Sequence, residues 1–415
     1  MERTKGLPRD SAVARLRLAV VLSAAAATAL KLGIAASTFG TNDVHYWRIF
    51  ALGVRLFGPV GIYGHQFRET PVYNHGPLAG WMLAAINWLL DHGIGSFPFL
   101  IRVPACLADF GTALLVFELV RLVRPVRQAA IAAILVVCSP VLFVVSGFHG
   151  NTDPVFVMFA LLSVYLLVVR GWAVAAGVAF GIAVSIKLVP IVLGPVLLVV
   201  LVRLGRRRLA GFVGGGALVF GLLWVPVFVS RWNGLRVQVF AYNGGVRRQW
   251  GLPQFLIWAH LPDGIAWLTG SGRFGILLIS GLAAAALVWR RPAALVPAVG
   301  LSLVLFLLLS SAFAMQYLVW ALAAAYLIDT AAATGYNVAA SIFVVAVYDH
   351  WNRALPWHWY EARADAFSAS EFVLMVVTWV LLAAVAVMGL LLVRGHTFSP
   401  SSRASSSSTR STGER

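Results

Sequence analysis

The stretch STFGTNDVHYWRIF, residues 37–50, places polar side chains directly after a long apolar run. Its Asp43 has the chemistry of a general base, because a carboxylate held beside an acceptor hydroxyl can take the hydroxyl proton during a transfer reaction. A carboxylate in this place is equally typical of a solvated loop or of a helix cap. Taken alone, the stretch favours the structural role by a small margin.

Two further ionisable residues share one face of a predicted helix. Arg102 and Asp109 are seven residues apart in an apolar run, which separates them by about 10 Å along a helix axis. An ionisable group inside a membrane segment is a functional hypothesis by default and faces the interior of the bundle. For Asp109 a structural ion pair is an equal alternative, whereas Arg102 favours a functional role.

The segment GFHGNTDP, residues 147–154, combines a capping pattern with a histidine. Asp153 before Pro154 is typical of a helix N-cap with proline at the first helical position, and we prefer that structural role for it. Capping does not account for His149, which is predicted to face the same side as Asp43. Lys187, at a predicted outer turn, either extends to the membrane surface or holds a lipid phosphate as a point charge.

Arginines and a glutamine on the predicted outer face complete the candidates. Arg247 and Arg248 follow two glycines in NGGVRRQWG, residues 243–251, and arginine can bind a phosphate through two hydrogen bonds. Arginines outside the membrane run against the positive-inside bias, so they indicate an anionic ligand. Gln316 begins an apolar run, and Trp320 behind it is interpreted as part of an interfacial aromatic belt.

Composition defines the scaffold that must position these residues. The chain has 415 residues, of which 60% are hydrophobic and 11% charged, against roughly 25% charged in soluble domains. Continuous Ala, Leu and Val runs near the membrane-spanning length predict an all-α polytopic membrane protein and not a barrel. The net charge of +17 reflects arginines in short loops and does not indicate nucleic-acid binding. Cys106 and Cys138 lie inside apolar runs and are predicted to stay unpaired.

Charge placement predicts the topology. Residues 1–17 stay in the cytoplasm, a membrane domain occupies 18–395, and the Ser-rich tail 396–415 is disordered and cytoplasmic. Twelve spans, with a margin of one, are predicted at 18–39, 99–120, 129–147, 154–169, 172–187, 189–202, 209–229, 274–289, 293–311, 316–333, 335–348 and 371–393. External loops are predicted at 40–98, 230–273 and 349–370.

One apolar segment is predicted not to cross. Residues 77–91 are short for a span, and a crossing there would move the basic loop 121–128 to the outside. We therefore expect a helix that lies at the outer surface. This topology places most histidines and acidic residues outside, so any active site is expected on the external face of a plasma-membrane protein.

With these residues in place, the chain resembles the GT-C superfamily of polyprenyl-phosphate-sugar-dependent glycosyltransferases. It looks most like the bacterial branch around glycosyltransferase family 87 and related mannosyltransferases. The resemblance covers roughly residues 16–335 and is carried by Asp43 and then, in order, by YNHGPLAG, RVPACLADFGTALLVFELVR, HGNTDPVFVMF, SIKLVPIVLGPVLL and FAMQYLVW. Each segment matches loosely, and their order is more specific than any one of them.

The resemblance implies a fold, a reaction and roles for residues. It implies a multi-helix fold with surface helices in the first external loop, a polyprenyl-phosphate-hexose donor with mannose as first choice, and inversion at the anomeric carbon. The acceptor would be a glycolipid, a polysaccharide or a protein. Asp43 matches the position of the catalytic base. The predicted donor- and substrate-binding residues are Arg102, Lys187, His149, Arg247, Arg248, His75, Tyr73, Glu69, Asp109 and Gln316. No residue is assigned to a metal, and a need for a divalent ion is left open.

The rival function is a transporter or a flippase of lipid-linked sugars. Such proteins concentrate polar residues near the membrane midplane and often contain internal repeats. Here the polar residues gather on one face and no repeat is seen, so this function ranks lower. A non-enzymatic assembly protein ranks third, because it would not need Asp109 inside the membrane.

Overall fold

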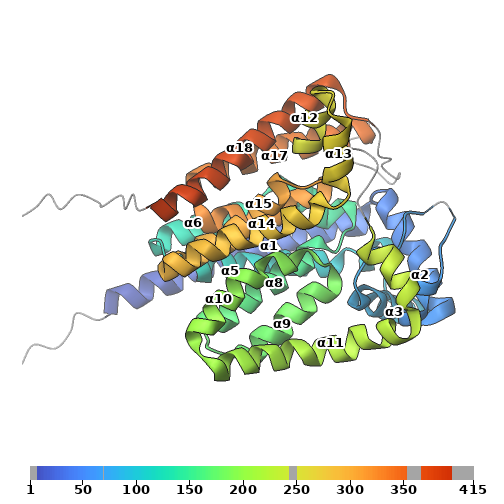
Figure 1. Ribbon diagram of the computed structural model, residues 1–415, viewed down its shortest axis with the longest axis horizontal. Coiled ribbons are helices and arrows are strands. Elements are labelled where there is room, and N and C mark those ends of the chain that lie inside the picture. Colours follow the sequence, from blue (N-terminus) through green and yellow to red (C-terminus); the bar gives the residue numbers. More distant parts are fainter. Residues whose placement is uncertain (1–6, 69, 243–249, 353–365, 395–415) are drawn as a thin grey trace, which may run out of the picture.

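The computed structural model describes residues 7–68, 70–242, 250–352 and 366–394, and its elements in these ranges are all helices (Figure 1). Seven helical segments among them are long and apolar enough to cross a membrane. They are α1 (Leu7–Ser37), α4–α5 (Phe97–Leu100, Val103–Val120), α6–α7–η2 (Val126–Val137, Pro140–Leu142, Phe143–His149), α11–η4 (Arg206–Leu235, Arg236–Phe240), α14 (Gly272–Arg290), α17 (Thr330–Trp351) and α18 (Ala369–Arg394).

Five shorter apolar segments coincide with the remaining predicted spans. They are α8 (Asp153–Val168), α9 (Ala173–Ile186), η3–α10 (Val189–Leu193, Gly194–Leu204), η5–α15 (Pro292–Ala294, Leu295–Leu308) and η6–α16 (Met315–Tyr317, Leu318–Ile328). The remaining described elements are α2 (Asn42–Gly61), η1 (Ile62–Gly64), α3 (Pro77–Asp91), α12 (Gly251–Trp258) and α13 (Pro262–Thr269). The predicted all-α membrane class is confirmed, while the count of twelve crossings stays a prediction.

One predicted boundary between spans is wrong. The sequence suggested a break near residue 334, but α16 ends at Ile328 and α17 begins at Thr330. Asp329 stands between them, and its carboxylate accepts hydrogen bonds of 3.0 Å from the backbone N–H groups of Ala331 and Ala332. This is an N-cap, which fixes where the second helix starts.

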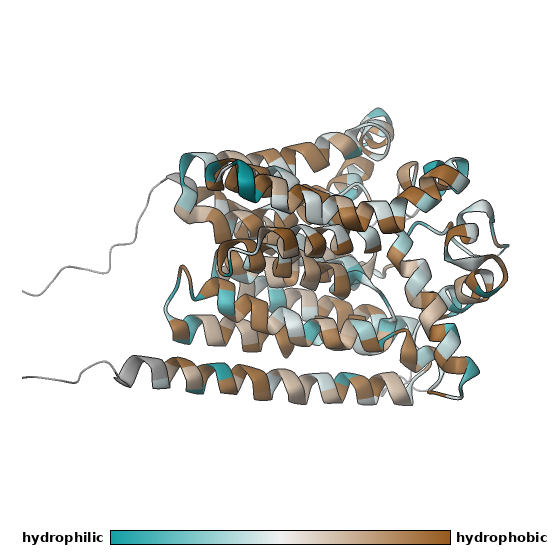
Figure 2. Ribbon diagram, turned by 90° about the horizontal axis from the view of Figure 1, so that it is seen from below, coloured by the Kyte–Doolittle hydropathy of each residue, from teal (hydrophilic) through white to brown (hydrophobic). Residues whose placement is uncertain are grey.

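The helix predicted at the surface has the predicted bounds. Helix α3 runs from Pro77 to Asp91, begins with proline in its first turn, and packs against α2. Asn87 of α3 donates a 2.7 Å hydrogen bond to the carbonyl of Ala51 in α2. Figure 1 shows α2 and α3 together at one end of the bundle, called here the α2 end, opposite the start of α1 and the end of α18. Figure 2 shows apolar residues along the length of the bundle helices.

Small residues shape the most extensive packing between two described helices, that of α9 against α11. A Cβ atom at Gly215 would lie 2.2 Å from the carbonyl oxygen of Val174, so only glycine allows these backbones to meet. Contacts between small residues are the usual means by which membrane helices pack closely. The adjacent Gly214 is exposed, and a Cβ atom there would meet nothing within 4 Å.

This contrast gives a matched test of the fold. Gly215→Ala is expected to destabilise the protein by about 1–3 kcal/mol, because the added methyl group forces α9 and α11 apart. Gly214→Ala adds the same methyl group to open space and is expected to be neutral or to stabilise by up to about 1 kcal/mol. Thermal unfolding of both variants in detergent measures the difference, and equal stabilities would contradict the described contact.

Candidate active site at the α2 end of the bundle

Asp43 lies in the first turn of α2, directly after the turn that follows α1. Thr41 is the N-cap of α2, and its hydroxyl accepts a 3.2 Å hydrogen bond from the backbone N–H of Asp43. The positive end of the helix dipole favours a negative side chain at this place. The Asp43 side chain is 28% exposed, so the carboxylate can be reached from outside the protein.

His149, at the end of η2, orients the Asp43 carboxylate. Its Nε2 lies 2.9 Å from Oδ2 of Asp43, and its Nδ1 faces the hydroxyl of Tyr348 in α17. The Thr41 hydroxyl donates to the backbone carbonyl of His149 at 2.9 Å, so it does not supply the proton for Nδ1. The imidazole therefore donates its Nε2–H to Asp43, and the Tyr348 hydroxyl holds Nδ1 in place.

Gln316, in η6, is the second group on the same carboxylate oxygen. Its Nε2 donates to Oδ2 of Asp43 at 3.4 Å. Within the described ranges, Oδ1 of Asp43 makes no hydrogen bond. One oxygen is therefore fixed by two donors from distant segments, and the other is free to accept a proton from a substrate hydroxyl.

Electrostatics keep this carboxylate ionised. Burial raises the pKa of Asp43, but the charge and hydrogen bond of His149, together with the charge of Lys187, outweigh burial and lower the pKa below its ordinary value. The neighbouring His75 behaves in the opposite way, because burial and the charge of Lys187 lower its pKa to about 3. At neutral pH the site thus combines an aspartate anion with a neutral His75.

Lys187, directly after α9, forms an ion pair with Asp153, a residue that the sequence predicted to be a helix N-cap. Its Nζ lies 2.8 and 3.1 Å from the two carboxylate oxygens of Asp153, and the Trp320 indole donates to Asp153 at 2.7 Å. Asp153 is not the N-cap that the sequence suggested: Thr152 occupies that position, and the Asp153 side chain points to Lys187. Trp320 is also not part of an outer belt, because it is 3% exposed and serves this network.

A cavity of about 370 Å³ opens beside Lys187. Its wall is mostly apolar and includes Phe240, Phe274, Phe306, Tyr317 and Trp320, together with the cations Lys187 and Arg273. The Lys187 ammonium lies over the rings of Tyr317 and Trp320, 4.6 and 5.2 Å from their centroids. This arrangement suits a ligand with an apolar part and an anionic group.

Arg273 is a site residue that the sequence reasoning missed. Its guanidinium donates to the carbonyl oxygens of Tyr242 at 2.7 Å, Ala241 at 3.2 Å and Phe240 at 3.3 Å, while its buried Nε has no partner in the described ranges. It stands at the end of a predicted outer loop, where its charge runs against the positive-inside bias. The positive-inside bias could have indicated Arg273 in the sequence, as it did Arg247 and Arg248.

Arg102 has a different role from the predicted phosphate contact. Its side chain is fully buried, and its three nitrogens donate only to the protein. The acceptors are the carbonyl oxygens of Pro98, Ala35, Thr38, Gly147 and Phe148 and the hydroxyl of Thr38, at 2.6–3.2 Å. Arg102 therefore joins the end of α1 to the end of η2, the two segments that lead to Asp43 and His149.

Asp109 also lies apart from the site. It forms a buried ion pair with Lys31 of α1, with 2.7 Å between Nζ and Oδ2 and almost no exposed surface on either side chain. This is the structural alternative that the sequence left open, and it does not agree with a substrate contact. The buried pair ties α1 to α5, because an unpaired charge in this place would be costly.

Tyr73 and His75 lie in the chain between η1 and α3, against α2. The His75 ring packs on Trp47 with 4.2 Å between centroids, and the Tyr63 hydroxyl donates to the His75 carbonyl at 2.6 Å. The Tyr73 hydroxyl is buried and unpartnered in the described ranges. Both residues therefore pack against α2, the helix that carries Asp43. The other candidates, Glu69, Arg247 and Arg248, lie outside the described residues.

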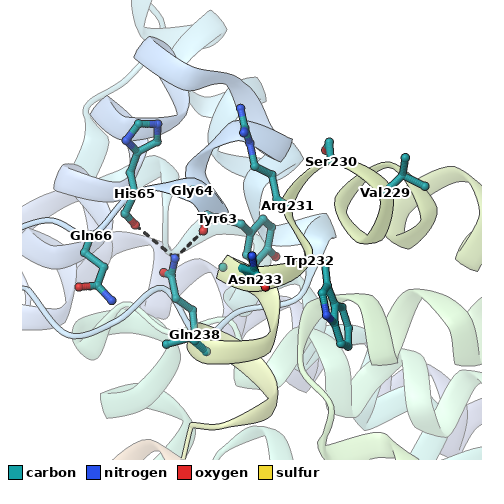
Figure 3. Close-up of a pocket in the computed structure, with 12 residues that line it drawn as sticks. Tyr63, Gly64, His65, Gln66, Val229, Ser230, Arg231, Trp232, Asn233 and Gln238 are labelled. Atoms are coloured by element: carbon teal, nitrogen blue, oxygen red, sulfur yellow. Dashed lines mark hydrogen bonds between the residues drawn. The ribbon is translucent and has the colours of Figure 1, made fainter.

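A second cavity, of about 560 Å³, is a separate feature. It lies between residues 63–66 and the junction of α11 with η4, and Asp43 and Lys187 are not in its wall (Figure 3). Among the described residues, no three His, Cys, Asp or Glu side chains gather as metal ligands.

Comparisons with known proteins address the fold. A family model described as dolichyl-phosphate-mannose-protein mannosyltransferase matches residues 74–230. The crystal structure of ArnT from Cupriavidus metallidurans bound to undecaprenyl phosphate gives a TM-score of 0.51 at 17% identity, over 91% of this chain and 77% of ArnT. The apo structure of the same ArnT gives 0.51 at 16% identity, over 89% and 76%. The chain has the GT-C fold.

This agreement confirms the GT-C resemblance at the level of the superfamily fold. The oligosaccharyltransferase of Archaeoglobus fulgidus tethered to an acceptor peptide gives a TM-score of 0.37 at 15% identity, over 91% of this chain and 55% of that one. No curated protein matches the chain in sequence. The branch around glycosyltransferase family 87 stays a prediction.

The Arg102 contacts predict a large effect on stability. Arg102→Leu is expected to cost about 3 kcal/mol or more, because several buried carbonyl groups lose their donor and each costs roughly 1–3 kcal/mol. Arg48, an exposed arginine of α2 with no ion pair in the described ranges, provides the control, and Arg48→Leu is expected to change little. Thermal unfolding in detergent compares the two. If Arg102→Leu were as stable as the wild type, Arg102 would not hold these helix ends.

Proposed function

We propose that this chain transfers a hexose from a polyprenyl-phosphate sugar to an acceptor hydroxyl, with Asp43 as the general base. The observation that carries the proposal is the Asp43 carboxylate, ionised, partly exposed, and held on one oxygen by His149 and Gln316. Its free Oδ1 can accept the proton of an incoming hydroxyl. Gln316 contacts Asp43 and the next residue, Tyr317, lines the cavity beside Lys187, so the base and the cationic cavity are neighbours.

The cavity beside Lys187 supports a lipid-linked donor. Its aromatic and aliphatic wall suits an isoprenoid chain, and Lys187 and Arg273 supply positive charge for a phosphate. The ArnT of similar fold was crystallised with undecaprenyl phosphate, and the matching family model is named for a dolichyl-phosphate-mannose enzyme. These names favour a polyprenyl-phosphate donor, and mannose is the sugar that we propose.

The reaction is a single displacement. The acceptor oxygen forms a bond to the anomeric carbon on the face opposite the phosphate, and its proton passes to Oδ1 of Asp43. The bond between the anomeric carbon and the phosphate oxygen breaks, and the polyprenyl phosphate leaves as an anion. Lys187 and Arg273 stabilise the charge that develops on the phosphate, so no general acid is needed. The sugar inverts, as in glycosidases in which a carboxylate activates the nucleophile.

Asp153 and Tyr348 act in this reaction as positioning residues. Asp153 contacts Lys187 through both carboxylate oxygens and so holds the ammonium at the cavity wall. Tyr348 faces Nδ1 of His149 and so determines which imidazole nitrogen turns its proton to Asp43. We place the site on the external face, with both termini in the cytoplasm, because the basic loops favour that topology. The acceptor remains a glycan, glycolipid or protein hydroxyl.

The first test removes the base. Asp43→Asn keeps the shape of the side chain but cannot accept a proton, and we expect about 10²–10⁴-fold slower transfer. Labelled polyprenyl-phosphate mannose and a membrane-lipid extract serve as substrates for the purified protein. The matched control is Asp91→Asn, since Asp91 is an exposed carboxylate at the end of α3.

Two outcomes would count against the proposal. Transfer that survives Asp43→Asn would move the base to another residue. If the wild type transferred neither mannose, glucose nor arabinose from such donors, a transporter or flippase would be favoured.

The second test follows pH. Transfer requires ionised Asp43, so kcat/KM is expected to fall as the pH drops through its lowered pKa. His149→Gln removes the imidazole charge that lowers this pKa, while burial still raises it, so the acid limb is expected to move to higher pH. His45→Gln is the control, because His45 is exposed and is two residues from Asp43. An unchanged profile in His149→Gln would exclude Asp43 as the group that the profile reports.

A further inference from the structure

The cavity of about 560 Å³ has a wall built from two segments far apart in the sequence. Residues 63–66, at the end of η1 and beyond, form one side, and residues 229–234 of α11, with Val237 and Gln238 of η4, form the other (Figure 3). Nothing in the proposed transfer reaction uses this cavity, because Lys187 and Arg273 line a different one.

The two sides are held rigidly together. The buried Gln238 amide donates to the carbonyl oxygens of Tyr63 at 2.7 Å and His65 at 3.2 Å, and its oxygen accepts from the N–H of Tyr73 at 3.2 Å. A Cβ atom at Gly234 would lie 1.7 Å from the Tyr63 carbonyl oxygen, so the backbones meet here as closely as they can. The cavity is therefore preformed, and a ligand would not have to order its wall.

Arg231 gives the cavity an uncompensated positive charge. Its backbone leaves the helical conformation inside α11, with φ −138° and ψ 30°, and its side chain lies along Gly64 on the opposite wall. In the part of the chain that the structure describes, its guanidinium has neither an ion pair nor a hydrogen bond. The amides of Gln66 and Asn233, which also line the cavity, can supply further donors.

The residues around the cavity indicate where it lies relative to the membrane surface. The part of α11 that leads up to Ser230 carries exposed apolar side chains, among them Leu222 and Val229, which is 82% exposed. The polar residues begin directly after Val229, and Trp232 is 46% exposed. Exposed aliphatic residues followed by arginine and tryptophan are typical of the boundary between the membrane and water, where lipid head groups lie.

We propose that this cavity binds a phosphate group, and that a phospholipid head group supplies it. The Arg231 guanidinium pairs with two phosphate oxygens, and the amides of Gln66 and Asn233 donate to the others. The preformed wall distinguishes the cavity from an arginine that merely extends to the membrane surface. A lipid bound here would contact residues 63–66, which lead to Tyr73 and His75 and so to the face of α2 on which those two residues pack.

The test measures lipid binding and does not depend on sugar transfer. Native mass spectrometry of the full-length protein in detergent counts retained lipid during titration with phosphatidylglycerol, and with diacylglycerol, which lacks the phosphate. We expect tight retention of about one phosphatidylglycerol, and at least about tenfold weaker retention by Arg231→Gln. Arg236→Gln is the matched control, because Arg236 is also exposed and nearby but does not line the cavity.

The remaining outcomes contradict either the phosphate site or the lipid as the source of the phosphate. Equal retention by Arg231→Gln and the wild type, or equal retention of diacylglycerol, would overturn the phosphate site. Displacement of phosphatidylglycerol by glycerol phosphate at matched concentration would keep the phosphate site and overturn the lipid source. Because no outcome involves transfer, failure of this proposal is distinguishable from failure of the proposed function.

Discussion

The contacts of Arg102 are the constraint on which the rest of the site depends. A helix ends with carbonyl groups that lack partners within the helix, and inside a membrane no water replaces them. Arg102 satisfies carbonyl groups at the ends of both α1 and η2 with one fully buried guanidinium. The planar five-donor group can do this, whereas a lysine ammonium could not. Asp43 follows the end of α1, and His149 is the last residue of η2.

The buried aspartates hold other side chains in place, whereas the partly exposed aspartate stays accessible. Asp153 and Asp109 are buried, and each is neutralised by a lysine, so they fix positions and are not available to substrate. Asp43 is the carboxylate near the cavity that keeps both an exposed side and a free oxygen. Burial alone would favour its protonated form, and His149 reverses this effect. Of these three aspartates, Asp43 is the one that is accessible for the proposed role of base.

The sequence indicated polar residues that stand out in an apolar chain. It did not indicate contacts between residues that are far apart in the sequence. Asp43, His149, Lys187 and Gln316 stand out because polar residues are rare in an apolar chain, and the helical class follows from the same runs. Tyr348 could not be assigned, because it meets His149 across 199 residues of sequence. The capping pattern was assigned to Asp153, but Thr152 is the N-cap and the Asp153 side chain pairs with Lys187. The role of Arg102 could not be predicted either. Its hydrogen-bond acceptors are mainly backbone carbonyl groups, which every residue carries whatever its type.

The cations at the α2 end differ in whether they have partners within the described part of the protein. Lys187 is paired with Asp153, and Arg273 is engaged by backbone carbonyl groups, so the donor cavity attracts an anion with cations that are already positioned. Positioned cations lose little entropy when a phosphate arrives, which suits a leaving group whose charge changes during the reaction. Arg231 has no such partner in the described ranges. An unpaired cation on a preformed wall is instead suited to a ligand that stays bound. In the two proposals the cavities therefore differ in what their positive charge does: one stabilises a leaving phosphate during turnover, and the other retains a bound ligand.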